Sequence, residues 1–148
     1  MVQIIVNGES YSVSDGQSVV DALNTLAIAH PQICYTPPLS PTQTCDTCIA
    51  QIDGQLQRTC STTVREGMRI ELHTDNAEKA RKEAMNRLLA NHELYCTVCE
   101  NNNGNCKLHN TVELMGIEDQ KYPFSEKVSN RAVDYSHPFY RYDPNQCI

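Results

Sequence analysis

The segment CYTPPLSPTQTCDTCIAQIDGQLQRTC, residues 34–60, contains four cysteines at the spacing C-x10-C-x2-C-x11-C. Four thiolates are a common ligand set of iron–sulfur clusters. Cys45 and Cys48 can hold one side of a cluster from a single tight loop, while Cys34 and Cys60 come from the flanking segments. Prolines stiffen the first gap because proline fixes φ and removes a backbone donor. A zinc site or two disulfides are the alternatives for the same four thiols.

Length and composition favour a small protein that needs reinforcement. The 148 residues suit one domain or two small ones, and they include no tryptophan, two phenylalanines and eight cysteines. A core this poor in large apolar residues usually depends on metal or on disulfides. The net charge of −6 argues against a general nucleic-acid binder, which would show a basic face.

The sequence shows no export signal at its start and no apolar run long enough to cross a membrane. We therefore expect a cytoplasmic protein without a membrane span. In that compartment, clustered cysteines are metal ligands or redox groups more often than disulfides.

The segments around the first cysteine group alternate between strand and turn signals. The expected strands cover residues 2–6, 11–13, 49–52, 56–59 and 68–73. Asn7 with Gly8, and Asp53 with Gly54, are hairpin signals, and Ser18 can cap a helix that follows the first hairpin. Hairpin, helix and cysteine loop in this order resemble a β-grasp ferredoxin. The first domain is therefore expected to span residues 1–74.

A helix is expected over residues 76–92, which contain no glycine or proline. Asp75 with Glu78 resembles a capping box, and Glu83 with Arg87 would pair on the exposed side. The expected apolar stripe consists of Ala77, Ala80, Ala84 and Leu88. This helix would bring His92 to a second group of candidate ligands.

That second group lies in HELYCTVCENNNGNC, residues 92–106, with the spacing H-x3-C-x2-C-x6-C. Its candidate ligands are His92, Cys96, Cys99 and Cys106. A Cys3His set suits structural zinc as well as iron, so spacing alone leaves both open. A short helix ended by Gly116 is expected next, and residues 119–148 read as an extended arm. The remaining histidines, which we expect at the surface or in ordinary packing, are His30, His73, His109 and His137.

The two ligand groups in this order resemble the N-terminal region shared by three kinds of protein. These are the large iron–sulfur subunit of respiratory complex I, iron-only hydrogenases, and the alpha subunit of molybdopterin-dependent formate dehydrogenases. The runs TCDTC at residues 44–48 and CTVCENNNGNC at residues 96–106 look most like the formate dehydrogenase branch. The six-residue gap before Cys106 departs from many relatives, which have five, and puts the path of that loop in question.

The resemblance implies a β-grasp domain with a 2Fe–2S cluster, then a small helical domain over residues 75–118 with a 4Fe–4S cluster. The overall fold class would be α+β. The implied 2Fe–2S ligands are Cys34, Cys45, Cys48 and Cys60, and the implied 4Fe–4S ligands are His92, Cys96, Cys99 and Cys106. Electron transfer to or from a redox partner subunit or carrier would be the function.

The ending DPNQCI, residues 143–148, resembles the lead-in to a further cluster motif in longer relatives, with Cys147 as its first ligand. On this interpretation the chain is the front of a longer polypeptide whose molybdopterin domain oxidises formate, and these residues alone are no catalyst. Two other readings stay open. One is the same segment of a hydrogenase or complex I-type subunit, and the other is a zinc-stabilised interaction module without redox function.

Overall fold

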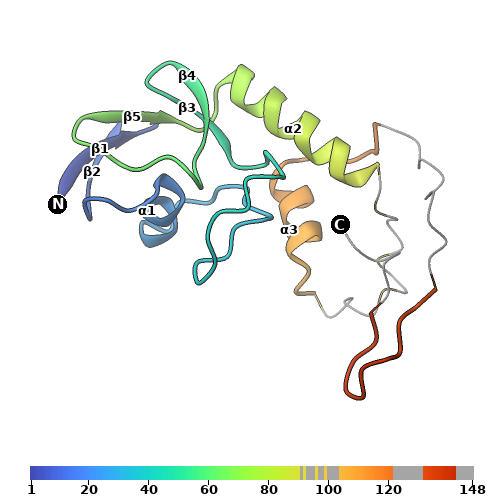
Figure 1. Cartoon of the computed structure of the whole chain (residues 1–148). Helices are drawn as coiled ribbons and strands as arrows, with labels where there is room; N and C mark the ends of the chain where they lie inside the picture. The colour runs from blue at the N-terminus through green and yellow to red at the C-terminus, as the bar shows by residue number, and fades with distance from the viewer. Residues whose placement is uncertain (91, 93–95, 97–98, 100–103, 122–131, 143–148) are drawn as a thin grey trace.

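The computed structural model describes residues 1–90, 92, 96, 99, 104–121 and 132–142. A five-stranded mixed sheet comes first, and two helices follow it along the chain (Figure 1). The strands are β1 (Val2–Val6), β2 (Glu9–Val13), β3 (Ile49–Ile52), β4 (Gln55–Arg58) and β5 (Met68–Glu71). The helices are α1 (Val19–Thr25), α2 (Asp75–Leu89) and α3 (Lys107–Leu114). The predicted α+β class is confirmed.

The sheet has the strand order β2-β1-β5-β3-β4. β1 is antiparallel to β2 and parallel to β5, while β3 is antiparallel to both β4 and β5. Asn7 and Gly8 turn the first hairpin with positive φ angles of 49° and 90°, as the sequence predicts. The first and last strands along the chain, β1 and β5, are therefore neighbours in the sheet. The cysteine segment of residues 34–60 lies between them in sequence.

Helix α1 begins where the sequence predicts it. The Ser18 side chain accepts a hydrogen bond from the Asp21 backbone N–H at 3.2 Å and donates to the Asp21 carboxylate at 2.7 Å. The helix buries Val19, Val20, Ala22 and Leu23. With the inner faces of the strands it closes one apolar core, formed by Ile4, Val6, Val13, Val19, Ala22, Leu23, Ala50, Ile52, Val64, Met68, Ile70 and Leu72.

Helix α2 differs in three ways from its prediction, the first being that it ends at Leu89 rather than at residue 92. Its N-cap is Thr74 rather than Asp75, because the Thr74 hydroxyl accepts from the Ala77 N–H at 3.3 Å while Asp75 already belongs to the first turn. Its buried face consists of Ala77, Arg81, Ala84, Met85 and Leu89. The buried face therefore includes Arg81, which lies outside the expected apolar stripe.

Helices α2 and α3 share a second apolar cluster. Met85 and Leu89 of α2 pack with Leu108 of α3 and with Met115, and Ile33 from the loop before β3 packs against them. The second helical unit is therefore built onto the segment that carries the first cysteine group.

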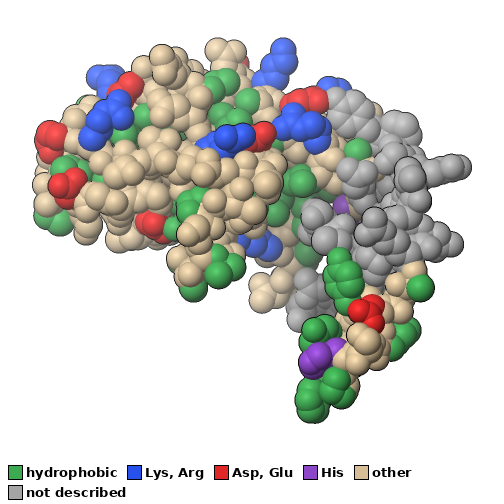
Figure 2. Space-filling model, viewed as in Figure 1, with side chains coloured by type: hydrophobic (Ala, Val, Ile, Leu, Met, Phe, Trp, Pro, Cys, Tyr) green, Lys and Arg blue, Asp and Glu red, His purple; other side chains and the backbone are tan. Residues whose placement is uncertain are grey.

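The described part of the C-terminal arm, residues 132–142, turns back on itself. A two-residue antiparallel bridge joins Asp134 and Tyr142, and the rings of His137 and Tyr140 stack with centroids 3.9 Å apart. Hydrophobic side chains and a histidine gather at the tip of this projection (Figure 2). Phe139 is 91% exposed there. Cys147 lies outside the described residues. Among the helices described, none is long and apolar enough to cross a membrane.

Candidate metal centres

The first cysteine group lies where the loop after α1 enters β3 and where the chain leaves β4. Cys45, Cys48 and Cys60 are buried, and Cys34 is half-buried. The thiols of Cys34 and Cys45 are neighbours, and so are those of Cys48 and Cys60. None of the described cysteines forms a disulfide. All four residues predicted for this site are therefore gathered in one place.

A left-handed turn shapes the loop between Cys45 and Cys48. Asp46 has φ of 57°, a conformation that aspartate tolerates better than most residues because its short side chain can bond locally. Its carboxylate accepts from the Arg58 Nε at 2.5 Å and from the Arg87 guanidinium at 3.2 Å. The expected pairing of Arg87 within its helix is replaced by this contact with the loop, and Glu83 pairs with Lys121 at 2.6 Å.

The ionisation of these thiols depends on their neighbours. Burial, followed by the adjacent Cys48, raises the pKa of the Cys60 thiol to about 12. Burial also raises the pKa of Cys45. For Cys34, burial is outweighed by hydrogen bonds from Cys45 and Thr44, which lower its pKa. Four neighbouring thiolates repel one another unless a cationic core lies between them.

Two side chains surround the sulfur atoms. The Thr47 hydroxyl, fully buried, lies 3.1 Å from the Cys45 Sγ and accepts from the Ile33 backbone N–H at 3.3 Å. Tyr35 packs with Val20 and the two buried cysteines of the second pair, and its hydroxyl donates to Asp21 at 2.5 Å. These contacts exclude water from the inner side of the site.

His30 is a further neighbour of the site that the sequence analysis left without a role. Its Nε2 lies 2.9 Å from the Cys48 carbonyl oxygen and 3.1 Å from the Thr59 hydroxyl, and the residue is 4% exposed. Burial lowers the pKa of His30 to about 4, so the neutral ring donates Nε2–H to the carbonyl at pH 7. No sequence signal marks this histidine, because its partner is a main-chain atom 18 residues away.

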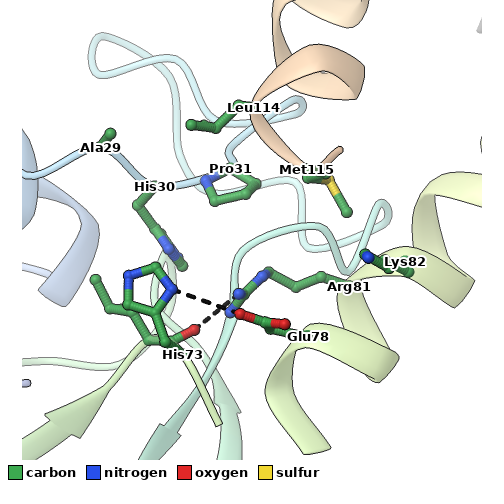
Figure 3. Close-up of a pocket in the computed structure, with 10 residues that line it drawn as sticks. Ala29, His30, Pro31, His73, Glu78, Arg81, Lys82, Leu114 and Met115 are labelled. Carbon is green, nitrogen blue, oxygen red and sulfur yellow. Dashed lines mark hydrogen bonds and ion pairs between the residues drawn. The ribbon is translucent and has the colours of Figure 1, made fainter. Parts of the chain in front are cut away.

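Arg81 forms hydrogen bonds with main-chain carbonyls near β3, the strand that begins directly after Cys48. Its guanidinium donates to the Ile49 carbonyl at 2.9 Å and to the Leu72 carbonyl at 2.7 Å. Beside it lies a small cavity, lined by His30, Pro31, His73 and Arg81 among others, where His73 approaches Glu78 at 3.5 Å (Figure 3). One helix therefore fixes the carbonyls at the start of β3 and just beyond β5.

The second ligand group is placed at the ends of two packed helices. His92 follows α2, and its backbone N–H bonds the Leu89 carbonyl at 3.4 Å. Cys106 is the N-cap of α3, and its Sγ accepts from the His109 N–H at 3.5 Å. Cys96 is exposed and Cys99 is half-buried. The joint ligation of one cluster by these four residues stays a prediction.

The first site fits a two-iron cluster by its donor chemistry. Each pair of neighbouring thiols can supply the two protein ligands of one iron. Among the described residues, no three His, Cys, Asp or Glu side chains form a ligand set for one metal ion. The fit therefore rests on two pairs of sulfurs and the apolar residues around them, rather than on one common centre.

Comparison with known proteins agrees with this arrangement. Residues 1–75 match the family model of a 2Fe-2S iron-sulfur cluster binding domain, and residues 81–121 match that of an NADH-ubiquinone oxidoreductase-G iron-sulfur binding region. The chain thus carries a 2Fe–2S binding domain followed by a 4Fe–4S binding region.

Curated relatives come from bacteria. The chain is 54% identical over 148 residues to "Putative formate dehydrogenase YrhE" of Bacillus subtilis, covering 99% of this chain and 15% of that protein. It is 42% identical over 145 residues to "Putative formate dehydrogenase SAUSA300_2258" of Staphylococcus aureus, covering 98% of this chain and 14% of that protein. The chain spans about one seventh of the length of these relatives.

A solved structure has the same fold over nearly the whole chain. A chain of an NAD+-reducing [NiFe]-hydrogenase in the H2-reduced state superposes with a TM-score of 0.86 and 25% identity, covering 99% of this chain and 62% of that one. The chain therefore belongs to the 2Fe-2S iron-sulfur cluster binding domain family, and as a whole it matches the N-terminal iron–sulfur segment of formate dehydrogenase-like oxidoreductases.

Proposed function

We propose that the chain relays single electrons through two iron–sulfur clusters. The first would be a 2Fe–2S cluster held by Cys34, Cys45, Cys48 and Cys60, and the second a 4Fe–4S cluster held by His92, Cys96, Cys99 and Cys106. The observation that carries the proposal is the gathering of four thiols, in two pairs, at one end of a β-grasp sheet. A bound cluster supplies reversible one-electron chemistry.

The protein would tune the first cluster through three groups around it. The Thr47 hydroxyl is placed to donate to the Cys45 sulfur, which stabilises added negative charge. Tyr35 keeps the site dry, and Arg58 beside Asp46 adds positive charge near the sulfurs. Hydrogen bonds to sulfur, burial and net charge are the known determinants of cluster potential.

In the longer protein, we propose that these clusters carry electrons from a molybdopterin domain that oxidises formate to CO2. The similarity to two formate dehydrogenase-like relatives supports this assignment. Electrons would leave to a redox partner subunit or a soluble carrier. Thiol ligands that must stay reduced are best suited to the cytoplasm, which is the compartment we propose.

The direct test is anaerobic purification followed by iron and acid-labile sulfide analysis and by EPR of the reduced protein. One 2Fe–2S and one 4Fe–4S cluster require about six iron and six sulfide per chain, with two paramagnetic signals. Replacing Cys48 by serine should remove the first signal, and replacing Cys99 should remove the second. Zinc without sulfide after anaerobic reconstitution would instead establish the zinc-stabilised module.

The second candidate is the same relay in a hydrogenase-type or complex I-type assembly. The similarity to the NAD+-reducing hydrogenase chain supports it, at lower identity than the formate dehydrogenase-like relatives. The two assignments differ in the electron donor. Reduction of both clusters by formate in the full-length protein supports the first, while reduction by hydrogen or NADH, with formate inactive, supports the second.

A further inference from the structure

We propose that Lys107 is the positioning residue that joins the two cluster sites and determines how efficiently an electron passes between them. The proposal rests on the relay function proposed above. The Lys107 Nζ donates to the main-chain carbonyl of Tyr35, with an N···O distance of 2.6 Å in partly buried surroundings. This bond connects residues 72 positions apart in the sequence.

The two ends of this bond each adjoin a candidate ligand. Tyr35 directly follows Cys34 of the first set, and Lys107 directly follows Cys106 of the second. Because the acceptor is a main-chain atom, the ammonium holds the backbone of the first loop itself rather than a rotatable side chain. Cys34 and Cys106 therefore each lie one residue from an end of this bond.

Apolar packing closes the other side of Cys34. Ile33, the residue before it, packs against the cluster of Met85, Leu89, Leu108 and Met115, with Cys106 partly buried against the same cluster. Figure 1 shows the loop before β3 lying beside α3. One flank of Cys34 is thus held by dispersion contacts and the other by a charge-assisted hydrogen bond.

A second link between the units is weaker. Arg87 of α2 pairs with Asp46, beside Cys45, at 3.2 Å, but the arginine side chain is 54% exposed. Exposed ion pairs contribute little because water and salt screen them. Arg81 of α2 also holds the Ile49 carbonyl, next to Cys48, but the link at Lys107 is the one whose two ends each adjoin a candidate ligand of a different set.

This arrangement affects the electron in two ways. The transfer itself is simple: one electron leaves the reduced cluster of one site and arrives at the oxidised cluster of the other, no bond forms or breaks, and the Lys107 protons stay on Nζ. The bond constrains the separation of the segments that carry Cys34 and Cys106. The ammonium also places a positive charge between the sites, which favours an added electron on either side.

The experiment compares holoprotein variants after anaerobic cluster loading. Lys107→Met removes the donor and the charge, and Lys107→Arg retains both. Lys121→Met is the matched control, because Lys121 makes an equally short contact, 2.6 Å, with Glu83 of α2. The readouts are iron and sulfide content, the midpoint potentials of both clusters, the magnetic interaction between the two reduced clusters, and the rate of intercluster equilibration after rapid reduction.

We expect Lys107→Met to load the same iron and sulfide as the parent, with lower potentials at both clusters, a weaker magnetic interaction and a several-fold slower equilibration. Lys107→Arg should restore these values, and Lys121→Met should leave them unchanged. Unaltered coupling and rate in a fully loaded Lys107→Met protein would overturn the proposal.

Two further outcomes keep the proposal separate from the relay function. If the parent protein carries no iron or sulfide, the relay function itself fails. If only Lys107→Met fails to load its clusters, the parent protein and Lys107→Arg provide the test. Two reduced clusters without a magnetic interaction in the parent refute the role of Lys107. A magnetic interaction in the parent that Lys107→Arg preserves supports it.

Discussion

Replacing Thr47 by valine should lower the reduction potential of the first cluster. The hydroxyl lies 3.1 Å from the Cys45 sulfur and already accepts a hydrogen bond from the Ile33 N–H. A cysteine that ligates iron as a thiolate carries no proton, so Thr47 must be the donor of the contact with sulfur. Valine has nearly the same shape but no hydroxyl, so the change deletes this bond with little effect on packing.

The size of the effect follows from the net value of one hydrogen bond. An O–H donor aimed at sulfur stabilises the more negative, reduced state more than the oxidised state. If that difference is about 0.5–1.5 kcal/mol, the one-electron potential falls by about 20–65 mV. The orphaned Ile33 N–H costs about 1 kcal/mol of stability in addition.

The assay is an EPR-monitored redox titration of the anaerobically loaded protein, with Thr47→Ser as the control that keeps the hydroxyl. The serine variant should stay close to the parent, and the 4Fe–4S signal should titrate unchanged in both variants. A valine variant whose first cluster keeps or raises its midpoint refutes the reasoning. A serine variant whose first-cluster midpoint falls as far as that of the valine variant also refutes it.

Three other changes have defined outcomes. His92→Cys replaces a neutral imidazole by a thiolate, so the midpoint of the second cluster should fall; potentiometry that finds it unchanged or raised contradicts this ligand assignment. Arg81→Met removes two hydrogen bonds to main-chain carbonyls and should cost about 3 kcal/mol in urea unfolding, with Arg81→Lys losing less. His30 has a folded-state pKa of about 4 against an ordinary 6.5, so the unfolded state binds a proton first as the pH falls. The stability that depends on neutral His30 is complete above pH 6.5 and decreases by about 3 kcal/mol as the pH falls to about 4. The loss of stability at low pH should be smaller in His30→Gln. Parallel stability–pH profiles of the parent and His30→Gln would exclude His30 as its cause.

Local signals were sufficient to predict most of the fold. Asn7 with Gly8 and Asp53 with Gly54 form the expected hairpin turns at positive φ, and Ser18 caps the expected helix. These features are short-range, because the turn or cap residue and its partner lie within a few positions of each other. The cap of α2 was assigned one residue late, since Thr74 and Asp75 are both good capping residues and only the backbone geometry separates them.

Contacts between distant residues could not be predicted in this way. Arg81 lies outside the expected apolar stripe, yet it is 6% exposed because the Ile49 and Leu72 carbonyls accept hydrogen bonds from its guanidinium. His30 and Lys107 likewise bond main-chain oxygens, and main-chain acceptors leave no trace in residue type. The candidate ligands could be singled out because their own chemistry is distinctive, whereas the residues that surround them depend on the folded arrangement.

The parallel pairing of β1 with β5 has a consequence for synthesis. Ile4 pairs with Met68, so the first strand has no partner on that side until the polypeptide has grown by more than sixty residues. All of residues 34–60 leave the ribosome before the sheet can close around them. Iron and sulfide delivered during translation would meet an open loop with accessible thiols, whereas delivery after release would meet three cysteines already enclosed. The order of chain growth and cofactor delivery therefore decides whether the thiols are met in an open loop or in a closed site.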